Sequence, residues 1–282
     1  MKSRDIWLWL RSVWIPALLL IMGCLVSSSS SGSLWSISIP SSGTVRAASF
    51  ITFRSGMEDV AKVDDHRLSW TINHWIGGTG GETGARFGIV DFGHSSSKSL
   101  LLELFDITKS RRAEMKIYGY PTLFGSELYM SMWYYLPSDW KLTGENYKQN
   151  QLIEIREWDK DRNIDWMLSV YIKYSDGKYV FEVGHKDNTI GQSSYVMYGR
   201  AGEVLRGQWF ELKFYVKRHS SSGIVALWLN GYRIIYKEDC KTRHVQDEYY
   251  LVPVKQYCDE TDTYPKTVYA DDLTISNALV KS

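Results

Sequence analysis

The chain has 282 residues, of which 44% are hydrophobic and 23% charged, so it is long enough to bury a core and too apolar to be disordered throughout. Its 33 basic residues nearly balance its 32 acidic residues, which excludes the basic excess of a general nucleic-acid-binding protein. Aromatic residues make up 14% of the chain. This large share favours β-strands and surfaces on which ligands stack.

The N-terminal segment has the pattern of an export signal. Lys2, Arg4 and Arg11 precede an uncharged apolar run over residues 12–26. That run has about 15 residues, which is closer to a signal-peptide core than to the roughly 20 residues that span a bilayer. We therefore predict that residues 1–26 are a signal peptide or a retained membrane anchor. Both outcomes place the rest of the chain outside the cytoplasm, secreted or anchored at the extracytoplasmic face of the membrane.

Two features follow the apolar run. Cys24 comes directly after a glycine and loosely resembles the lipidated cysteine of bacterial lipoproteins, and the alternative, which we favour, is a cysteine within an apolar helix. Residues 27–46 are rich in serine and read as a linker. We expect contact with a membrane only through this N-terminal part of the chain.

The exported part of the chain contains two cysteines, Cys240 and Cys258. In an oxidising compartment they are candidates for a disulfide, and two separate buried thiols are the alternative. The sequence has no CxxC or HxxxH spacing, so it gives no support for a zinc site.

Residues 47–282 are predicted to form one all-β domain. Apolar and polar residues alternate along 112–119 and 127–136, and no segment keeps a helical period over three turns. Asp176-Gly177 and Asn230-Gly231 each separate two such alternating segments, which is typical of tight β-hairpins. Many regular strands without helical crossovers favour a two-sheet antiparallel β-sandwich.

Several stretches resemble the concanavalin-A-like jelly rolls of polysaccharide lyases and of their carbohydrate-binding, laminin-G-like relatives. They are RAEM at residues 112–115, ELYMSMWYYLPSDW, GQWFELKFYVKRHSSSGIVALWLNG and VYADDLTIS, and together they span roughly residues 112–276. The resemblance implies a jelly-roll fold and a polysaccharide ligand. It marks the paired strands of the sandwich and says little about catalysis.

The resemblance also implies a set of catalytic residues. Such lyases cut uronic-acid polymers by β-elimination, which needs cationic or amide groups at the substrate carboxylate and a Tyr or His that moves protons. Arg112 and Glu114 match the Arg-x-Glu strand of these lyases. Where a Gln-x-His pair is expected, this chain has Glu154 and Arg156. Arg156 can neutralise a uronate but cannot act as a base, and a salt-bridged Glu/Arg pair on a binding surface is the alternative interpretation.

In this interpretation Arg112 and Arg156 neutralise the uronate, while Tyr171 or His185 moves protons. The expected substrate-binding residues are charged or aromatic and would share one sheet if the strands are neighbours in the expected order. They are Glu114, Lys116, Tyr129, Trp133, Glu154, Trp158 and Lys173. Such a surface suits a glycan, and an anionic glycan in particular. The alternative is a solvent-exposed sheet with cross-strand pairs and no ligand.

Asp271 and Asp272 lie where related jelly rolls bring the last strand beside the first and bind a structural calcium ion. Glu58 or Asp59 could supply an N-terminal ligand, since two carboxylates and backbone carbonyls can suffice for Ca²⁺. The alternative is a pair of aspartates at the end of a strand. No other cofactor is expected.

The sequence therefore predicts, as the first hypothesis, an exported jelly-roll protein that binds an extracellular and anionic polysaccharide. The second hypothesis is a polysaccharide lyase of related fold that acts on a uronic-acid polymer. A third is an adhesion or structural surface domain without a glycan ligand. Glycoside hydrolysis ranks last, because Glu154 and Glu157 have opposite parity on one strand and cannot form a retaining carboxylate pair about 5 Å apart.

Overall fold

The computed structural model describes residues 52–55, 64–65, 68–75, 84–95, 97–106, 112–119, 126–142, 149–158, 165–189, 194–244, 249–257 and 266–276. All of them belong to one compact unit, Trp35–Ser282. Every regular element within these ranges is a β-strand, and none of the ranges holds a helix that is long and apolar enough to cross a membrane. The predicted signal segment and linker lie outside the described residues.

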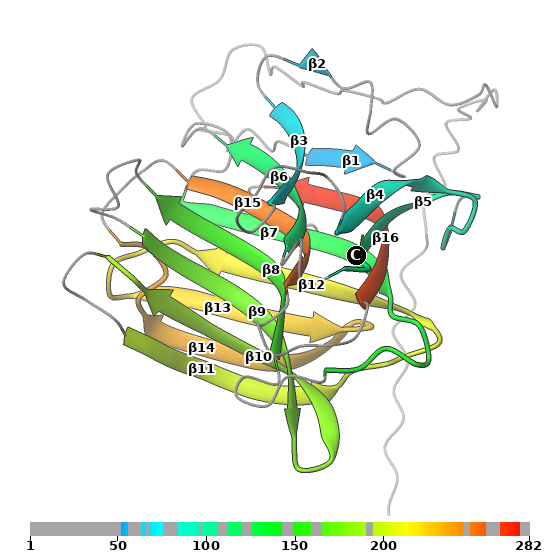
Figure 1. Cartoon of the computed structure of the whole chain (residues 1–282). Coiled ribbons are helices and arrows are strands. Elements are labelled where there is room, and N and C mark those ends of the chain that lie inside the picture. The colour runs from blue at the N-terminus through cyan, green and yellow to red at the C-terminus, as the bar shows by residue number, and fades with distance from the viewer. Residues whose placement is uncertain are drawn as a thin grey trace, which may run out of the picture. The chain divides into compact units, whose positions relative to one another are not determined.

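The strands form two antiparallel sheets, shown stacked on each other in Figure 1. Sheet A has the order β14 (Tyr232–Cys240), β13 (Gly223–Leu229), β12 (Trp209–Lys217), β7 (Glu127–Tyr135), β16 (Lys266–Ser276), β5 (Ser99–Leu104) and β4 (Ala85–Val90), with β1 (Thr52–Ser55) also paired to β16. Sheet B has the order β11 (Ser194–Glu203), β10 (Lys178–Asp187), β9 (Asp165–Ser175), β8 (Gln149–Trp158), β15 (Tyr249–Tyr257), β6 (Arg112–Gly119), β3 (Leu68–Trp75) and β2 (Asp64–Asp65).

The two C-terminal strands lie in the interior of the two sheets. β15 separates β6 from β8 in sheet B, and β16 separates β7 from β5 in sheet A. Strands that are far apart in sequence therefore become neighbours, as expected for a jelly roll. The predicted two-sheet antiparallel β-sandwich is confirmed.

The core lies between the sheets and follows the alternation seen in the sequence. On β12, Phe210, Leu212 and Phe214 are fully buried, and Leu212 and Phe214 lie opposite Leu229 and Leu227 of β13. Burying one such side chain contributes about 1.5–3 kcal/mol. Because successive residues of a strand point to opposite faces, each sheet also presents an outer face, and these outer faces carry the polar and aromatic side chains.

The two predicted hairpin turns are confirmed by their backbone angles. Asp176 and Gly177 have φ values of 51° and 82°, and Asn230 and Gly231 have values of 49° and 83°. A type I′ turn needs positive φ at both central residues, a conformation that glycine and Asn or Asp tolerate best. These turns fix the register of β9 with β10 and of β13 with β14.

The predicted disulfide is not formed in this structure. Cys240 is a buried free thiol at the end of β14, and its Sγ lies 3.5 Å from the carbonyl oxygen of Gly223. Burial raises the pKa of this thiol to about 11. Cys258 lies outside the described residues. The alternative of separate thiols therefore fits Cys240, which fills space in the core.

Candidate functional site

The outer face of sheet B carries a continuous set of ionic and phenolic side chains, here called the charged face. Its members project from β6, β15, β8, β9, β10 and β11. Ala113, Ile155 and Val170 of three of these strands are buried in the core, so their direct neighbours in sequence project outward. Arg112, Glu114, Glu154, Arg156, Ser169 and Tyr171 thus share one face.

At the centre of the charged face, Lys255 joins two carboxylates. Lys255 lies on β15, directly opposite Glu114 of β6. Its Nζ lies 2.6 Å from Oε2 of Glu154 on β8 and 3.4 Å from Oε2 of Glu114. All three residues are 1% exposed. Burial lowers the pKa of Lys255, and the two carboxylates oppose that shift.

Arginines extend this arrangement at both ends. Arg112 lies 3.5 Å from Glu114, and Arg156 lies 3.8 Å from Glu154 and 2.6 Å from Asp165. Burial lowers the pKa of Arg156, but the carboxylates of Glu154 and Asp165 more than offset this and raise it overall. The result is a line of alternating charges across four strands, here called the ion chain: Arg112, Glu114, Lys255, Glu154, Arg156 and Asp165.

A second cluster, here called the Glu182 cluster, lies at the other side of the charged face. The carboxylate of Glu182 on β10 is fully buried and lies 2.6 Å from Nζ of Lys173 and 2.5 Å from Nη2 of Arg200. It also accepts a hydrogen bond from the hydroxyl of Tyr195. Burial raises the pKa of Glu182, but the hydrogen bonds from Lys173, Tyr195 and Arg200 outweigh burial and lower it overall. Glu182 is therefore an ionised anchor for Tyr195.

Two tyrosines lie between the ion chain and Lys173. Tyr171 is 2% exposed, whereas Tyr195 is 42% exposed, and their ring centroids are 6.0 Å apart. The Tyr195 hydroxyl lies over Gly184, where a Cβ atom would come within 2.7 Å of it. Burial raises the pKa of Tyr171 to about 12. Burial and the hydrogen bond to Glu182 also raise the pKa of Tyr195. Tyr195 is thus the more accessible phenol of the pair.

Comparison with known proteins gives this geometry a context. A family described as polysaccharide lyase matches residues 61–274, most of the chain. The chain belongs to this polysaccharide lyase family. No curated protein matches it.

Solved structures of lyases share the fold of this family member. The endo-β-1,4-glucuronan lyase from the fungus Trichoderma reesei is similar with a TM-score of 0.55 and 13% identity, over 70% of this chain and 89% of that one. The alginate lyase vAL-1 from Chlorella virus is similar with a TM-score of 0.50 and 6% identity, over 69% and 91% of the two chains. At these identities the likeness shows a common fold and no more.

The structure brings most of the predicted lyase residues together. Arg112, Glu114, Glu154 and Arg156 belong to the ion chain, while Tyr171 and Lys173 lie on β9 beside it. Lys116 and Trp158 occupy positions of matching parity on β6 and β8, and their side chains lie outside the described residues.

His185, the expected alternative to Tyr171 for moving protons, does not lie on the charged face. His185 has the parity of Phe181 and Val183 on β10 and points between the sheets, where it is 5% exposed and lies beside Trp166. Its Nδ1 lies 2.5 Å from the hydroxyl of Tyr198. Burial, with the nearby Lys241 ammonium, lowers the pKa of His185 to about 4. This neutral imidazole belongs to the interior and cannot reach a ligand on the charged face.

The expected placement of Tyr129 and Trp133 on the same sheet as the charged residues is wrong. Both lie on β7, which belongs to sheet A, and they project from its outer face. Trp133 stacks on His94 with ring centroids 3.6 Å apart, and the ring centroid of Tyr129 lies 6.3 Å from that of Trp228. They therefore lie on the opposite side of the sandwich.

Asp271 and Asp272, two of the expected calcium ligands, are hydrogen-bonded to residues 94–95. Asp271 is fully buried and accepts hydrogen bonds from the backbone amides of His94 and Asp272, both at 2.8 Å. Asp272 accepts a hydrogen bond at 2.7 Å from the hydroxyl of Ser95. Among the residues the structure describes, no three His, Cys, Asp or Glu side chains form a metal-binding group, and Glu58 and Asp59 lie outside them. The two aspartates thus tether residues 94–95 to β16.

Five residues of the ion chain and the Glu182 cluster were not predicted from the sequence: Asp165, Glu182, Tyr195, Arg200 and Lys255. Lys255 and Glu182 each interrupt an apolar stretch, LVPVKQY and YVFEVGH, and a charge inside such a stretch is a signal for a buried ion pair. Tyr195 and Arg200 carried no such signal, because β11 shows no clear alternation of buried and exposed residues.

Proposed function

We propose that this protein is a lyase that cleaves a uronic-acid polysaccharide by β-elimination on the charged face. One observation carries the proposal: cations from β6, β8 and β9 converge on the same face as a partly exposed tyrosine. Such a reaction removes the proton on C5 of a uronate and breaks the C4–O bond, which leaves an unsaturated sugar. It needs positive charge at the carboxylate and a group that carries protons.

The cations Arg156 and Lys173 are the proposed carboxylate partners. Arg156 lies on β8 opposite Met167 of β9, and Lys173 lies on β9 two residues after Tyr171. The two cations therefore flank the part of β9 that carries Tyr171. Their side chains are 14% and 23% exposed, so both can be reached from solvent. Arg112, at the far end of the ion chain, adds a third cation to the face along which a polyanionic chain can lie.

Tyr195 is the proposed proton carrier, and Tyr171 packs beside its ring. As a phenol, Tyr195 can protonate the leaving glycosidic oxygen; as a phenolate, it can take the C5 proton. Its raised pKa makes the phenolate scarce at neutral pH. The rate is therefore expected to rise with pH across the alkaline range, up to the pKa of the phenol.

The test is the absorbance of unsaturated products when the protein is mixed with alginate, glucuronan or heparin. Tyr195→Phe is expected to lower the rate by about 10²-fold or more, the usual loss when a general acid or base is removed. Tyr232→Phe is the matched control, since this tyrosine is 79% exposed on β14 of the other sheet. Equal rates for Tyr195→Phe and the wild type would refute the role of Tyr195.

A binding protein without catalysis is the second candidate. It is favoured by the ion chain itself, in which each cation already faces a carboxylate and little net charge remains. This candidate predicts no absorbance with any of the three polymers, together with retention of the protein on one of them.

The N-terminal sequence supports a further proposal about location. An apolar run that follows three basic residues supports export, so the protein would meet its polysaccharide outside the cytoplasm. Detection of the protein in a culture medium or on the cell surface tests this.

A further inference from the structure

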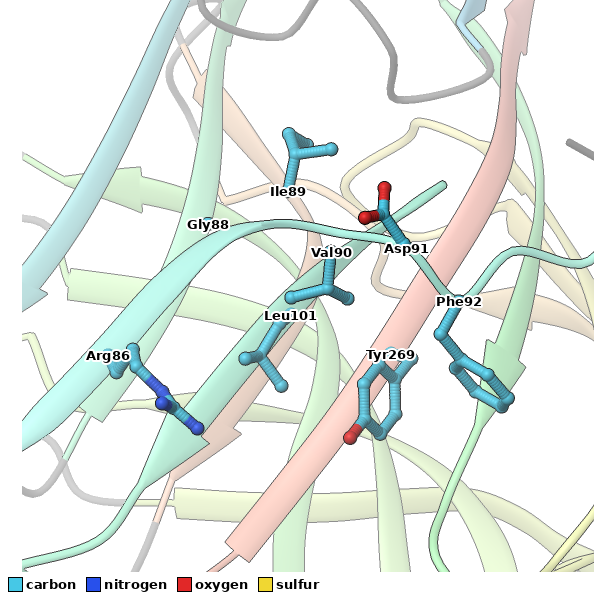
Figure 2. Close-up of a pocket in the computed structure, with 8 residues that line it drawn as sticks. All are labelled: Arg86, Gly88, Ile89, Val90, Asp91, Phe92, Leu101 and Tyr269. Atoms are coloured by element: carbon cyan, nitrogen blue, oxygen red, sulfur yellow. The ribbon is translucent and has the colours of Figure 1, made fainter. Parts of the chain in front are cut away.

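The outer face of sheet A contains a pocket remote from the charged face, at the edge formed by β4 and β5. It has a volume of about 400 Å³ and is lined by Arg86, Gly88, Ile89, Val90, Asp91, Phe92, Leu101 and Tyr269. This size lies within the roughly 300–1,000 Å³ typical of small-molecule sites. Figure 2 shows Arg86 at one end of the pocket and Tyr269 with Phe92 at the other.

The floor of the pocket is apolar. Val90, Leu101 and Tyr269 point to the same side of the sheet, whereas Ile89 and Asp91 point away from it (Figure 2). Gly88 lies opposite Leu101 in the β4–β5 register, and a Cβ atom added at Gly88 would meet nothing within 4 Å. The absence of a side chain at this position thus leaves open space over the floor.

The aromatic end of the pocket is held by ring contacts. The ring of Phe92 lies 4.9 Å from those of Tyr135 and Tyr269 and 5.5 Å from that of Trp209, measured between centroids. Phe92 is nevertheless 38% exposed. A ring that is fixed by its neighbours and still open to solvent can stack on a ligand without a large loss of side-chain entropy.

The other end of the pocket offers a cation. The Arg86 side chain is 62% exposed, and its Nη2 lies 2.8 Å from Oε2 of Glu103. A guanidinium has five N–H donors, so one ion pair leaves donors that face solvent. Arginine binds carboxylates in a planar, two-pronged geometry. The pocket thus combines an apolar floor, an aromatic wall and a solvent-exposed guanidinium, and these features together match a sugar ring that bears a carboxylate.

We propose that this pocket is a second carbohydrate-binding site, which holds one uronic acid unit with its apolar face on the floor and its carboxylate on Arg86. The polysaccharide class follows from the family, and the uronic acid rests on the proposed function. The site is separate from the reacting groups, because it lies on the opposite sheet. It would tether a long substrate while the charged face acts on another part of the same chain.

The experiment uses the full chain with Tyr195→Phe, so that substrate is consumed much more slowly, and titrates it by calorimetry with tetrasaccharides of glucuronic acid and of alginate. Two binding sites per chain are expected. Adding Gly88→Trp, which fills the open space over the floor, should remove one site. Adding Arg86→Ala instead should weaken that same site by about tenfold or more, the loss expected for a charge-assisted hydrogen bond.

The matched control is Tyr232→Ala, an exposed aromatic residue at the remote edge of the same sheet, which should leave both sites unchanged. Thermal unfolding checks that each variant is folded. The proposal is overturned if neither Gly88→Trp nor Arg86→Ala changes the number of binding sites or their affinity. A change from dimer to monomer in Gly88→Trp also overturns it, because the pocket would then be a contact between copies of the chain. If the wild type shows no lyase activity and the titration finds a single site that Gly88→Trp abolishes, the proposed function is refuted, while the pocket remains a carbohydrate-binding site.

Discussion

Replacement of Lys255 by methionine tests the physical basis of the charged face. Lys255 is 1% exposed and lies between two carboxylates that are equally buried, at 2.6 and 3.4 Å. With an effective dielectric constant of about 20, these distances correspond to attractions of roughly 6 and 5 kcal/mol. The desolvation of three charges offsets much of this, so the net contribution of the group is smaller.

Removing the cation alone leaves Glu114 and Glu154 buried without the charge that links them. Breaking a buried pair in this way costs about 3–5 kcal/mol, a large part of the 5–15 kcal/mol that stabilises a typical domain. Lys255→Met should therefore lower the free energy of unfolding, measured in urea at pH 8, by about that amount. Lys178→Met is the control, because Lys178 and Glu203 form a pair at 3.4 Å with both side chains more than 60% exposed. That change should cost about 0–1 kcal/mol.

The cost in Lys255→Met should also depend on pH. Without the cation, one buried carboxyl is expected to take up a proton, so its pKa in the folded state lies above its unfolded value. Stability from such a group is present at low pH and is lost as pH rises through the folded pKa. The deficit relative to the wild type should thus be smaller at pH 5 than at pH 8. A cost no larger than that of Lys178→Met, or a deficit that grows on acidification, would refute the reasoning.

Three further predictions concern single residues. Glu182→Gln removes the negative charge that raises the pKa of Tyr195, so the rising limb of the lyase rate should move to lower pH, and an unshifted profile would contradict the role of that carboxylate. Gly184→Ala places a Cβ atom 2.7 Å from the Tyr195 hydroxyl, so the tyrosine must move. This displacement of Tyr195 should lower the cleavage rate by about tenfold or more, and unchanged kinetics would contradict the prediction. The pKa of His185 is lowered to about 4, so the unfolded chain takes up a proton first on acidification, and stability should fall by about 2–3 kcal/mol between pH 6.5 and 4. His185→Gln should remove most of this fall in urea unfolding experiments, and an equal fall in both proteins would count against it.

The alternation of residues along each strand was enough to predict the sandwich and the outward face of β6, β8 and β9. It placed Arg112, Arg156 and Tyr171 on one side of their strands, as the structure confirms. Alternation tells which of two faces a residue occupies, but it does not tell which sheet the strand joins. For that reason Tyr129 and Trp133 were assigned to the wrong sheet.

The other misses have different physical reasons. His185 has the same parity as Phe181 and Val183, so the sequence already placed it among interior residues, and its chemistry was weighed above its position. Lys255 became central only because β15 pairs with both β8 and β6, which lie roughly 100 and 140 residues earlier in the chain, and no local pattern encodes such a pairing. The position of Tyr195 over Gly184 depends on the irregular register of β10 with β11, which could not be predicted from the sequence either.

The insertion of β15 between β6 and β8 has a consequence for biogenesis. Until residues 249–257 have left the ribosome, β6 and β8 each lack one of their two partners, and the edge of each strand that β15 later covers stays open. In the same way, β5 and β7 each lack one partner until β16 has been synthesised. Both sheets are therefore completed by strands that are synthesised after their neighbours, so a translation product interrupted before β15 should expose unpaired edges and be captured by chaperones or proteases.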